Sequence, residues 1–128
     1  MKKEYTRLPD AELEVMQVLW QNQPPMGTSE ILEILNQFKN WNISTLQTLL
    51  SRLVTRGFIQ SKKQGKNNFY TPLVEEESYL ASENKSFLDR LNQSSLTKFV
   101  STLMQSNSVS KEDLQELKEF IEKQSEEE

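Results

Sequence analysis

Cysteine and histidine are both absent from the sequence, and aspartate occurs only at positions 10, 89 and 113. Without cysteine the chain can form no disulfide, thiolate metal site or cysteine nucleophile, and without histidine it lacks the commonest acid–base group of enzymes. Glutamate is plentiful, but no pair of acids lies beside a glycine- or proline-rich loop that would shape a cleft. We therefore expect a protein that is not an enzyme and that uses no metal and no cofactor.

Long apolar runs are absent too. No segment approaches the ~18 apolar residues that a membrane-spanning helix needs, and the N-terminus lacks the apolar stretch of a signal peptide. We expect a cytoplasmic protein with no membrane insertion. The length of 128 residues suits one domain, or one domain with a small appendage, and the low apolar content of 35% predicts a core that gains from a partner's surface.

Acidic residues are missing from one long stretch, between Glu33 and Glu75. The net charge of the chain is −4, but residues 1–72 hold nine Lys or Arg against six Asp or Glu, whereas residues 73–128 hold six against thirteen. The acid-free stretch contains six cations, Lys39, Arg52, Arg56, Lys62, Lys63 and Lys66. A basic segment beside an acidic one indicates a nucleic-acid-binding surface that the total charge conceals, with chance clustering as the alternative.

Hydrophobic periodicity divides the chain into six helices and one hairpin. Helices are predicted over residues 9–21, 28–38 and 43–56, the second with an apolar stripe that ends at Phe38. Two short β runs around residues 64–68 predict a hairpin that ends at Pro72. Three more helices follow, and the last begins at a capping box formed by Ser110 and Asp113. Residues 123–128 are expected to fray.

The third predicted helix has two unlike faces. Leucines at 46, 49, 50 and 53 recur with the i, i+3, i+4, i+7 spacing of a buried face. The other face has no acid, and its side chains are mostly short: Ser44, Thr45, Thr48, Ser51, Arg52 and Thr55. A solvated helix normally mixes Glu with Lys, so this face predicts contact with a surface that acids would repel. An exposed helix that is merely polar is the alternative.

Three helices followed by a hairpin is the element order of a winged helix-turn-helix, in which the third helix enters the major groove. Short hydroxyl side chains can meet base edges there, a threonine methyl can pack on a thymine methyl, and arginine can reach a guanine or a phosphate. We predict base contacts from Ser44, Thr45, Gln47, Thr48 and Arg52. Backbone contacts are predicted from Thr55, Lys62, Lys63, Lys66 and Asn67. A lysine-rich loop that is only solvated is the alternative for the hairpin.

The three C-terminal helices each carry one apolar stripe, too little for a second self-sufficient core. We therefore predict a mainly α protein with a winged-helix DNA-binding domain over residues 1–74 and a helical dimerisation domain over residues 75–128. Two copies would read two half-sites of a near-palindromic operator. An intramolecular bundle against the winged helix is the alternative. The predicted dimer contacts are Phe87, Leu91, Leu96, Phe99, Val100, Leu103, Met104, Leu114, Leu117 and Ile121.

Three segments of the sequence resemble one family. The segments "DAELEVMQVLW", "WNISTLQTLLSRLVTRGFIQSKKQGKNNFYTPLV" and "SFLDRLNQSSLTKFV" are similar to the BlaI/MecI/CopY family of bacterial repressors. The resemblance implies a homodimer on double-stranded operator DNA with TACA/TGTA half-sites, and repression of a β-lactam-resistance or related stress operon. By position, Thr45 and Thr48 would read bases, and Arg52 and the hairpin lysines would hold the backbone.

The resemblance also implies how repression ends. Copper-responsive members carry C-terminal Cys-x-Cys motifs, which this chain lacks, so the penicillinase and methicillinase repressor branch remains. In that branch a membrane sensor with a metalloprotease domain triggers cleavage in the C-terminal domain. The family's cleaved bond, commonly Asn-Phe, falls opposite Thr102-Leu103, where the local sequence differs. Two rival functions stay open: a winged-helix regulator released by a small ligand, and a winged-helix module that binds another protein.

Overall fold

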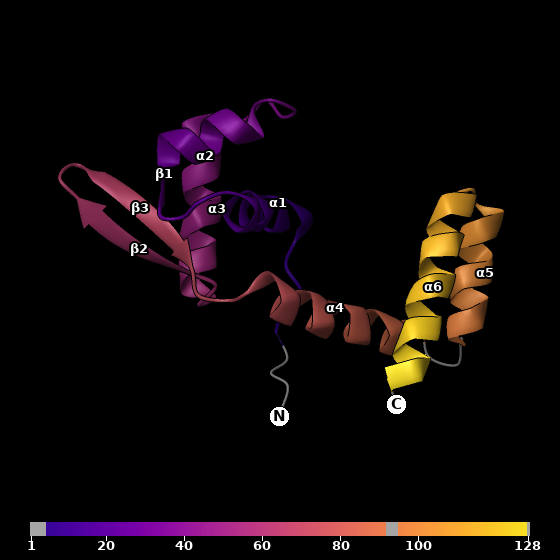
Figure 1. Ribbon diagram of the computed structural model, residues 1–128. Coiled ribbons are helices and arrows are strands. Elements are labelled where there is room, and N and C mark those ends of the chain that lie inside the picture. Colours follow the sequence, from indigo (N-terminus) through magenta and orange to yellow (C-terminus); the bar gives the residue numbers. More distant parts are fainter. Residues whose placement is uncertain (1–4, 92–94, 128) are drawn as a thin grey trace. The chain divides into compact units, whose positions relative to one another are not determined.

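The computed structural model of the chain describes residues 5–91 and 95–127 and divides into two compact units (Figure 1). The first unit ends at Phe87, and the second begins at Leu88. The elements follow in the order α1 (Asp10–Gln21), β1 (Met26–Gly27), α2 (Thr28–Leu35), α3 (Ile43–Thr55), β2 (Ile59–Gln64), β3 (Asn67–Pro72), α4 (Glu76–Leu91), α5 (Leu96–Gln105) and α6 (Lys111–Glu127).

A leucine-rich core joins the first three helices. The four leucines of α3 that the sequence predicted to be buried are at most 6% exposed: Leu46, Leu49, Leu50 and Leu53. They share the core with residues of α1 and α2, namely Val15, Met16, Leu19, Ile31 and Leu35. Fully burying one such side chain is worth about 1.5–3 kcal/mol relative to leaving it in water. This burial determines which side of α3 is left outside.

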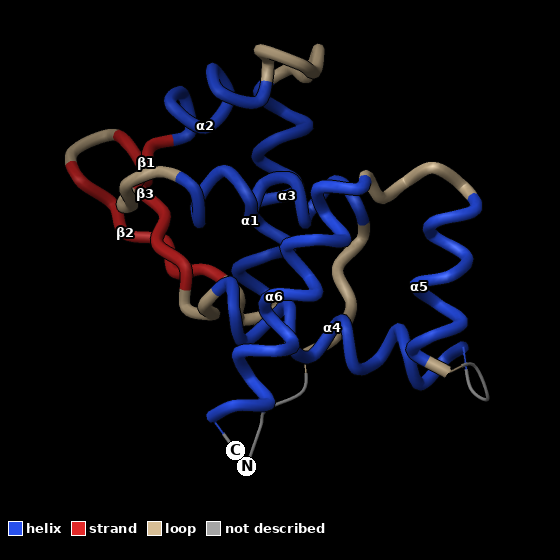
Figure 2. Tube along the Cα trace, turned by 45° about the vertical axis from the view of Figure 1, so that its right-hand side comes forward, coloured by secondary structure: helices blue, strands red, loops and turns tan. Residues whose placement is uncertain are grey.

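The strands form one antiparallel sheet in the order β1-β3-β2, beside the helices (Figure 2). The predicted hairpin consists of β2 and β3, in register from Ile59 opposite Pro72 to Gln64 opposite Asn67. Gly65 has a φ of 64° in the two-residue turn, a backbone conformation that favours glycine and suits a tight hairpin. Three helices with this hairpin wing make the winged-helix fold that the sequence predicted.

The strand β1 was not predicted from the sequence. Its two residues pair with β3, Met26 opposite Tyr70 and Gly27 opposite Phe69. A two-residue strand is too short to show the alternating pattern on which strand prediction depends. The pairing ties the start of α2 to the wing, so these two elements are held together by the sheet.

Two predicted helix ends are wrong. The helix α2 ends at Leu35, and Phe38, which the sequence placed on its apolar stripe, is 64% exposed. The side chain of Asn36 closes the turn that follows, accepting from the N–H of Trp41 at 2.9 Å and donating to its carbonyl at 3.0 Å. At the other end of the chain, α6 continues to Glu127, where fraying was expected from residue 123.

The second unit consists of the end of α4 together with α5 and α6. The predicted capping box is confirmed, because Ser110 and Asp113 each accept the other's backbone N–H at 3.0 Å. No described side chain of α5 or α6 is fully buried, and several apolar side chains of both helices are exposed in the single chain. Among the described helices, none is both long and apolar enough to span a membrane.

The helix α4 takes part in both units. Its first turns pack on the winged helix, where Tyr79 and Ser82 are buried. This packing explains why the first compact unit reaches Phe87, beyond residue 74, after which the sequence divided the chain. The assignment of residues 75–128 to dimerisation concerns function, and it stays a prediction.

Candidate DNA-binding surface

The outward side of α3 carries the base-contacting residues that the sequence predicted. The exposed predicted residues on this helix are Ser44, Thr45, Gln47, Thr48, Arg52 and Thr55. The helix begins after Asn42, whose side chain accepts a hydrogen bond from the backbone N–H of Thr45 at 2.9 Å. Because the leucines hold the opposite face in the core, the outward residues cannot turn inward.

The hydroxyl protons of two threonines on this face are used within the helix. Thr45 Oγ1 donates to Asn42 Oδ1 at 3.0 Å, and Thr48 Oγ1 donates to the carbonyl of Ser44 at 3.0 Å. Each hydroxyl oxygen can still accept a hydrogen bond, and each side chain still presents its methyl group. In this state the two threonines can accept from the amino groups of adenine or cytosine and pack on thymine methyls.

Two of the six cations in the acid-free stretch are neutralised by acids of α1. Arg56 Nε lies 2.6 Å from Glu12 Oε1, and Lys39 Nζ lies 3.0 Å from Glu14 Oε2. The other four cations are exposed and make no ion pair with any residue in the described ranges: Arg52, Lys62, Lys63 and Lys66. The basic patch is therefore smaller than the sequence indicated, because it lies on α3 and the wing alone.

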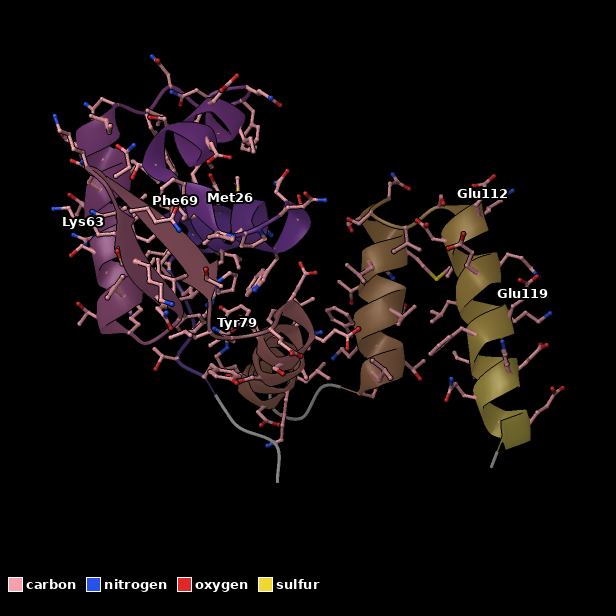
Figure 3. The ribbon with its side chains drawn as sticks, turned by 60° about the vertical axis from the view of Figure 1, so that its left-hand side comes forward. Met26, Lys63, Phe69, Tyr79, Glu112 and Glu119 are labelled. Carbon is pink, nitrogen blue, oxygen red and sulfur yellow. The ribbon has the colours of Figure 1, made fainter. Side chains whose placement is uncertain are left out.

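The wing lysines do not all point the same way. In the β2–β3 ladder Lys62 lies opposite Phe69, and Lys63 lies opposite Asn68. Figure 3 shows Lys63 and Phe69 on the hairpin. Successive side chains of a strand point to opposite faces, so Lys62 and Lys63 lie on different faces of the hairpin. Lys66 lies in the turn at the tip. The two neighbouring lysines thus cannot lie side by side against one phosphate, which the sequence alone did not show.

A groove of about 270 Å³ separates the wing from the helices. It brings together predicted contact residues from two separate elements, Gln47 of α3 and Lys66 and Asn67 of the wing tip. A DNA backbone that passes between α3 and the wing would meet these side chains at once. The groove therefore joins one predicted base contact to two predicted backbone contacts.

The same groove contains polar residues that the sequence analysis missed. Thr28 and Ser29 at the start of α2 line it, together with Asn68 of β3. The N–H groups at the start of a helix attract phosphate, so the first turn of the second helix in the predicted helix-turn-helix was the signal that could have found them. An acid lies nearby as well, because Glu30 Oε1 accepts from the N–H of Gly27 at 3.1 Å.

The sequence matches the penicillinase repressor family over residues 8–123. The chain belongs to this family. It is 32% identical over 120 residues to a penicillinase repressor of Bacillus licheniformis, covering 94% of this chain and 93% of the relative. It is 31% identical over 113 residues to the methicillin resistance regulatory protein MecI of Staphylococcus aureus strain N315, covering 88% and 91%. The predicted family is therefore confirmed.

A solved structure of a family member is also similar. The monomeric form of Bacillus licheniformis BlaI, in complex with the blaP half-operator, has a TM-score of 0.51 and 38% identity, covering 62% of this chain and 94% of that chain. The similarity agrees with the winged-helix fold of the first unit. The similar protein was solved in complex with its half-operator DNA.

The residues that the sequence assigned to the dimer lie on α4, α5 and α6. Five of them are exposed: Phe87, Leu96, Met104, Leu117 and Ile121. Four are partly buried: Phe99, Val100, Leu103 and Leu114. The side chain of Leu91 lies outside the described part of the structure. The bond between Thr102 and Leu103, which the sequence aligned with the family's cleavage site, lies inside α5.

Proposed function

We propose that this penicillinase repressor-family protein is a DNA-binding transcriptional repressor that binds a dyad operator as a homodimer. The observation that carries the proposal is the outward face of α3. That face is exposed, it contains no acid, and it accompanies four cations that make no ion pair with the described residues. A carboxylate there would repel phosphates, whereas short hydroxyl side chains and arginine suit a groove about 12 Å wide.

The residues divide into two roles on the DNA. Ser44, Thr45, Gln47, Thr48 and Arg52 meet base edges because they lie on the part of α3 that enters the major groove. Contacts to the sugar–phosphate backbone come from Thr55, Lys62, Lys63, Lys66 and Asn67, joined by the start of α2. Backbone contacts position the protein and supply most of the salt-dependent affinity, whereas base contacts supply sequence preference.

Exposed apolar side chains on α5 and α6 support the homodimer. Leu96, Met104, Leu117, Phe120 and Ile121 are each at least 40% exposed, which a stable single chain would disfavour. Two copies related by a two-fold axis would bury these side chains and present two α3 helices to two half-sites. The half-sites are of the TACA/TGTA type that the family resemblance implies. A β-lactam-resistance or related stress operon is the proposed target.

Relief of repression by proteolysis is the last part of the proposal. Thr102 is exposed and Leu103 is partly buried, and Thr102 Oγ1 donates to the carbonyl of Lys98 at 2.8 Å. A protease acts on an extended chain, so the last turns of α5 must open first. No side chain of α5 is fully buried, so this opening costs less than the opening of a helix in a core. A cut here would separate the apolar residues of α5 from α6 and weaken the dimer.

The experiment that tests DNA binding is a fluorescence anisotropy titration of the full chain. Three duplexes are compared: a TACA/TGTA dyad, a single half-site and a scrambled sequence of the same composition. We expect two chains per dyad and a preference for the dyad over the scrambled duplex of at least about 10³-fold at physiological salt. Equal affinity for all three would contradict sequence-specific repression, and binding to none would favour the protein-interaction module.

The experiment that tests proteolytic relief uses the chain with its activated membrane sensor. Fragments are mapped by mass spectrometry during induction, and the uninduced sample is the control. We expect a cut inside α5 at Thr102-Leu103. An intact chain at a promoter that is already induced would contradict proteolysis and would favour release by a small ligand.

A further inference from the structure

The start of α4 is attached to the winged helix by a segment from the other end of the unit. The backbone N–H of Tyr5 donates to Ser82 Oγ at 2.9 Å, and the backbone N–H of Leu8 donates to the hydroxyl of Tyr79 at 2.9 Å. Arg7 Nε lies 3.2 Å from Glu83 Oε1. Residues 79, 82 and 83 are spaced i, i+3 and i+4, so one face of α4 receives all three contacts. We call residues 5–8 the clasp segment.

Aromatic packing reinforces the same attachment. Tyr79 is 1% exposed, and its ring lies 5.7 Å from Phe58 and 5.8 Å from Trp20, centroid to centroid. Tyr5 of the clasp segment packs on Phe58 at 5.8 Å. Figure 3 shows Tyr79 at the place where α4 meets the winged helix. The side chain of Tyr79 is therefore enclosed by the clasp segment, by Trp20 of α1 and by Phe58, which lies between α3 and β2.

The two halves of α4 differ in burial. Tyr79 and Ser82 in its first half are buried, whereas every residue from Asn84 to Arg90 is exposed. The first half is consequently held against the winged helix at two successive turns. Two fixed turns define the direction of a helix axis, and one contact alone would leave it free to tilt.

We propose that Tyr79 and Ser82 are positioning residues which, through the clasp segment, fix the direction in which α4 leaves the winged helix and thereby set which half-site spacing the dimer accepts. The inference rests on the proposed dimer and its dyad operator, and it adds a determinant of operator selection that touches no DNA.

A small change in the direction of α4 produces a large displacement at its far end, because the helix is long. From Tyr79 to Leu91 the helix rises about 18 Å, at roughly 1.5 Å per residue. A tilt of about 10° moves its far end by about 3 Å, which is close to the ~3.4 Å that separates successive base pairs. In a two-fold dimer both arms tilt. Loss of the clasp contacts should therefore change the tolerated spacing by about one or two base pairs.

Two substitutions remove the hydrogen bonds and keep the packing. Tyr79→Phe leaves the ring in place and removes the acceptor for the N–H of Leu8, and Ser82→Ala removes the acceptor for the N–H of Tyr5. Matched controls lie close by. Ser78→Ala is the control for Ser82→Ala, because Ser78 is an exposed serine one turn before Ser82 in α4. Tyr70→Phe is the control for Tyr79→Phe, because it removes a hydroxyl from the buried tyrosine of β3.

The test measures the affinity of each full-length chain for two sets of duplexes. The first is a single TACA half-site, and the second is a series of dyads whose half-sites are moved apart in steps of one base pair. We expect the wild type and both controls to show a narrow spacing optimum. For each chain we compare the affinity for the dyad of optimal spacing with the affinity for a dyad whose spacing is two base pairs longer. In the double variant Tyr79→Phe/Ser82→Ala this ratio should be about tenfold smaller than in the wild type, with half-site affinity unchanged.

Three other results separate the possible failures. A spacing profile identical in the double variant and the wild type overturns the inference. An equal loss of affinity for half-site and dyads also overturns it, because that pattern indicates a merely structural role. A wild type that binds no duplex rejects the proposed function itself. If the double variant does not fold, amide hydrogen exchange of the wild type decides: the amides of Tyr5 and Leu8 should exchange at least about tenfold more slowly than in an unstructured peptide, and free exchange refutes the clasp.

Discussion

Arg52 lies in the last turn of α3, and Arg56 is the residue that follows the helix as its C-cap. The two arginines make different contacts. Arg52 is exposed on the outward face, whereas Arg56 forms an ion pair with Glu12 of α1. The two arginines form a matched pair for mutagenesis, because Arg→Ala removes the same atoms from positions four residues apart at the end of α3. We predict that Arg52→Ala weakens operator binding at almost unchanged stability. Arg56→Ala should instead destabilise the fold.

The burial of Glu12 sets the cost of Arg56→Ala. Glu12 is 1% exposed, and the side chain of Arg56 is 32% exposed. Removing one partner of a fully buried ion pair costs about 3–5 kcal/mol, since the other charge is left without compensation. The guanidinium end of this pair is open to solvent, so water can reach Glu12 after the substitution. We therefore expect a loss of about 2 kcal/mol. For a unit of this size that lowers Tm by roughly 10 °C.

The exposure of Arg52 sets the other half of the prediction. A substitution at an exposed residue with no ion pair changes stability by less than about 0.5 kcal/mol. A lost arginine–base contact costs about 1–3 kcal/mol in binding, which is roughly a 5- to 150-fold weaker affinity. A single half-site duplex is the suitable ligand, because it measures one copy of α3 without the effect of dimerisation.

The assay combines thermal unfolding with half-site anisotropy for wild type and both variants. Operator binding of Arg52→Ala equal to wild type would refute the assignment of the outward face. A variant Arg56→Ala with unchanged Tm and weakened binding would refute the assignment of Arg56 to the fold. The double variant Glu12→Leu/Arg56→Met is the control, since replacing a buried pair by apolar residues is often close to neutral.

Further predictions concern one side chain each. Lys66→Ala should weaken binding to all duplexes alike and lower the slope of log affinity against log salt by about one, and an unchanged slope would remove Lys66 from the backbone contacts. Thr48→Val should keep more operator affinity than Thr48→Ser in the same titration, because the Thr48 hydroxyl proton is committed to Ser44 whereas its methyl is available; the reverse order would contradict this. Burial raises the pKa of Tyr79 above 10.0, aided by the charge of Glu83 and opposed by the N–H of Leu8 and by Arg7. The protonated Tyr79 phenol therefore contributes its full stability below about pH 10, and this contribution is lost as the pH rises through the folded-state pKa. Phenylalanine cannot ionise, so alkaline unfolding should begin at higher pH in Tyr79→Phe.

Several features followed from local rules that the sequence displays directly. The leucine spacing of α3, the glycine turn of the wing and the capping box at Ser110 each involve residues within a few positions of one another. Helical periodicity, backbone preference and capping act over that range, so the order of the six helices and the hairpin could be predicted. The outward face of α3 followed as well, because it is the side that the leucines leave free.

Other features depended on residues far apart in the chain. The neutralisation of Arg56 joins it to Glu12 across 44 positions, and the clasp joins Tyr5 to Ser82 across 77. Pattern analysis counted Arg56 and Lys39 in the basic patch because their acidic partners lie in another helix. The exposure of Phe38 had a local origin instead, since Asn36 bonds to the backbone of Trp41 five residues later and α2 ends before the apolar stripe does.

The sequence by itself determined the elements, their order and the uncharged face of the third helix, because these depend on contacts between near neighbours along the chain. Only the tertiary structure decided which cations remain unpaired, that Gln47 and the wing tip line one groove, which threonine protons are already used, and that the start of α4 packs on the winged helix. Those properties arise when packing brings distant side chains within hydrogen-bonding distance. No periodicity or composition records which of the many possible partners a polar side chain will meet.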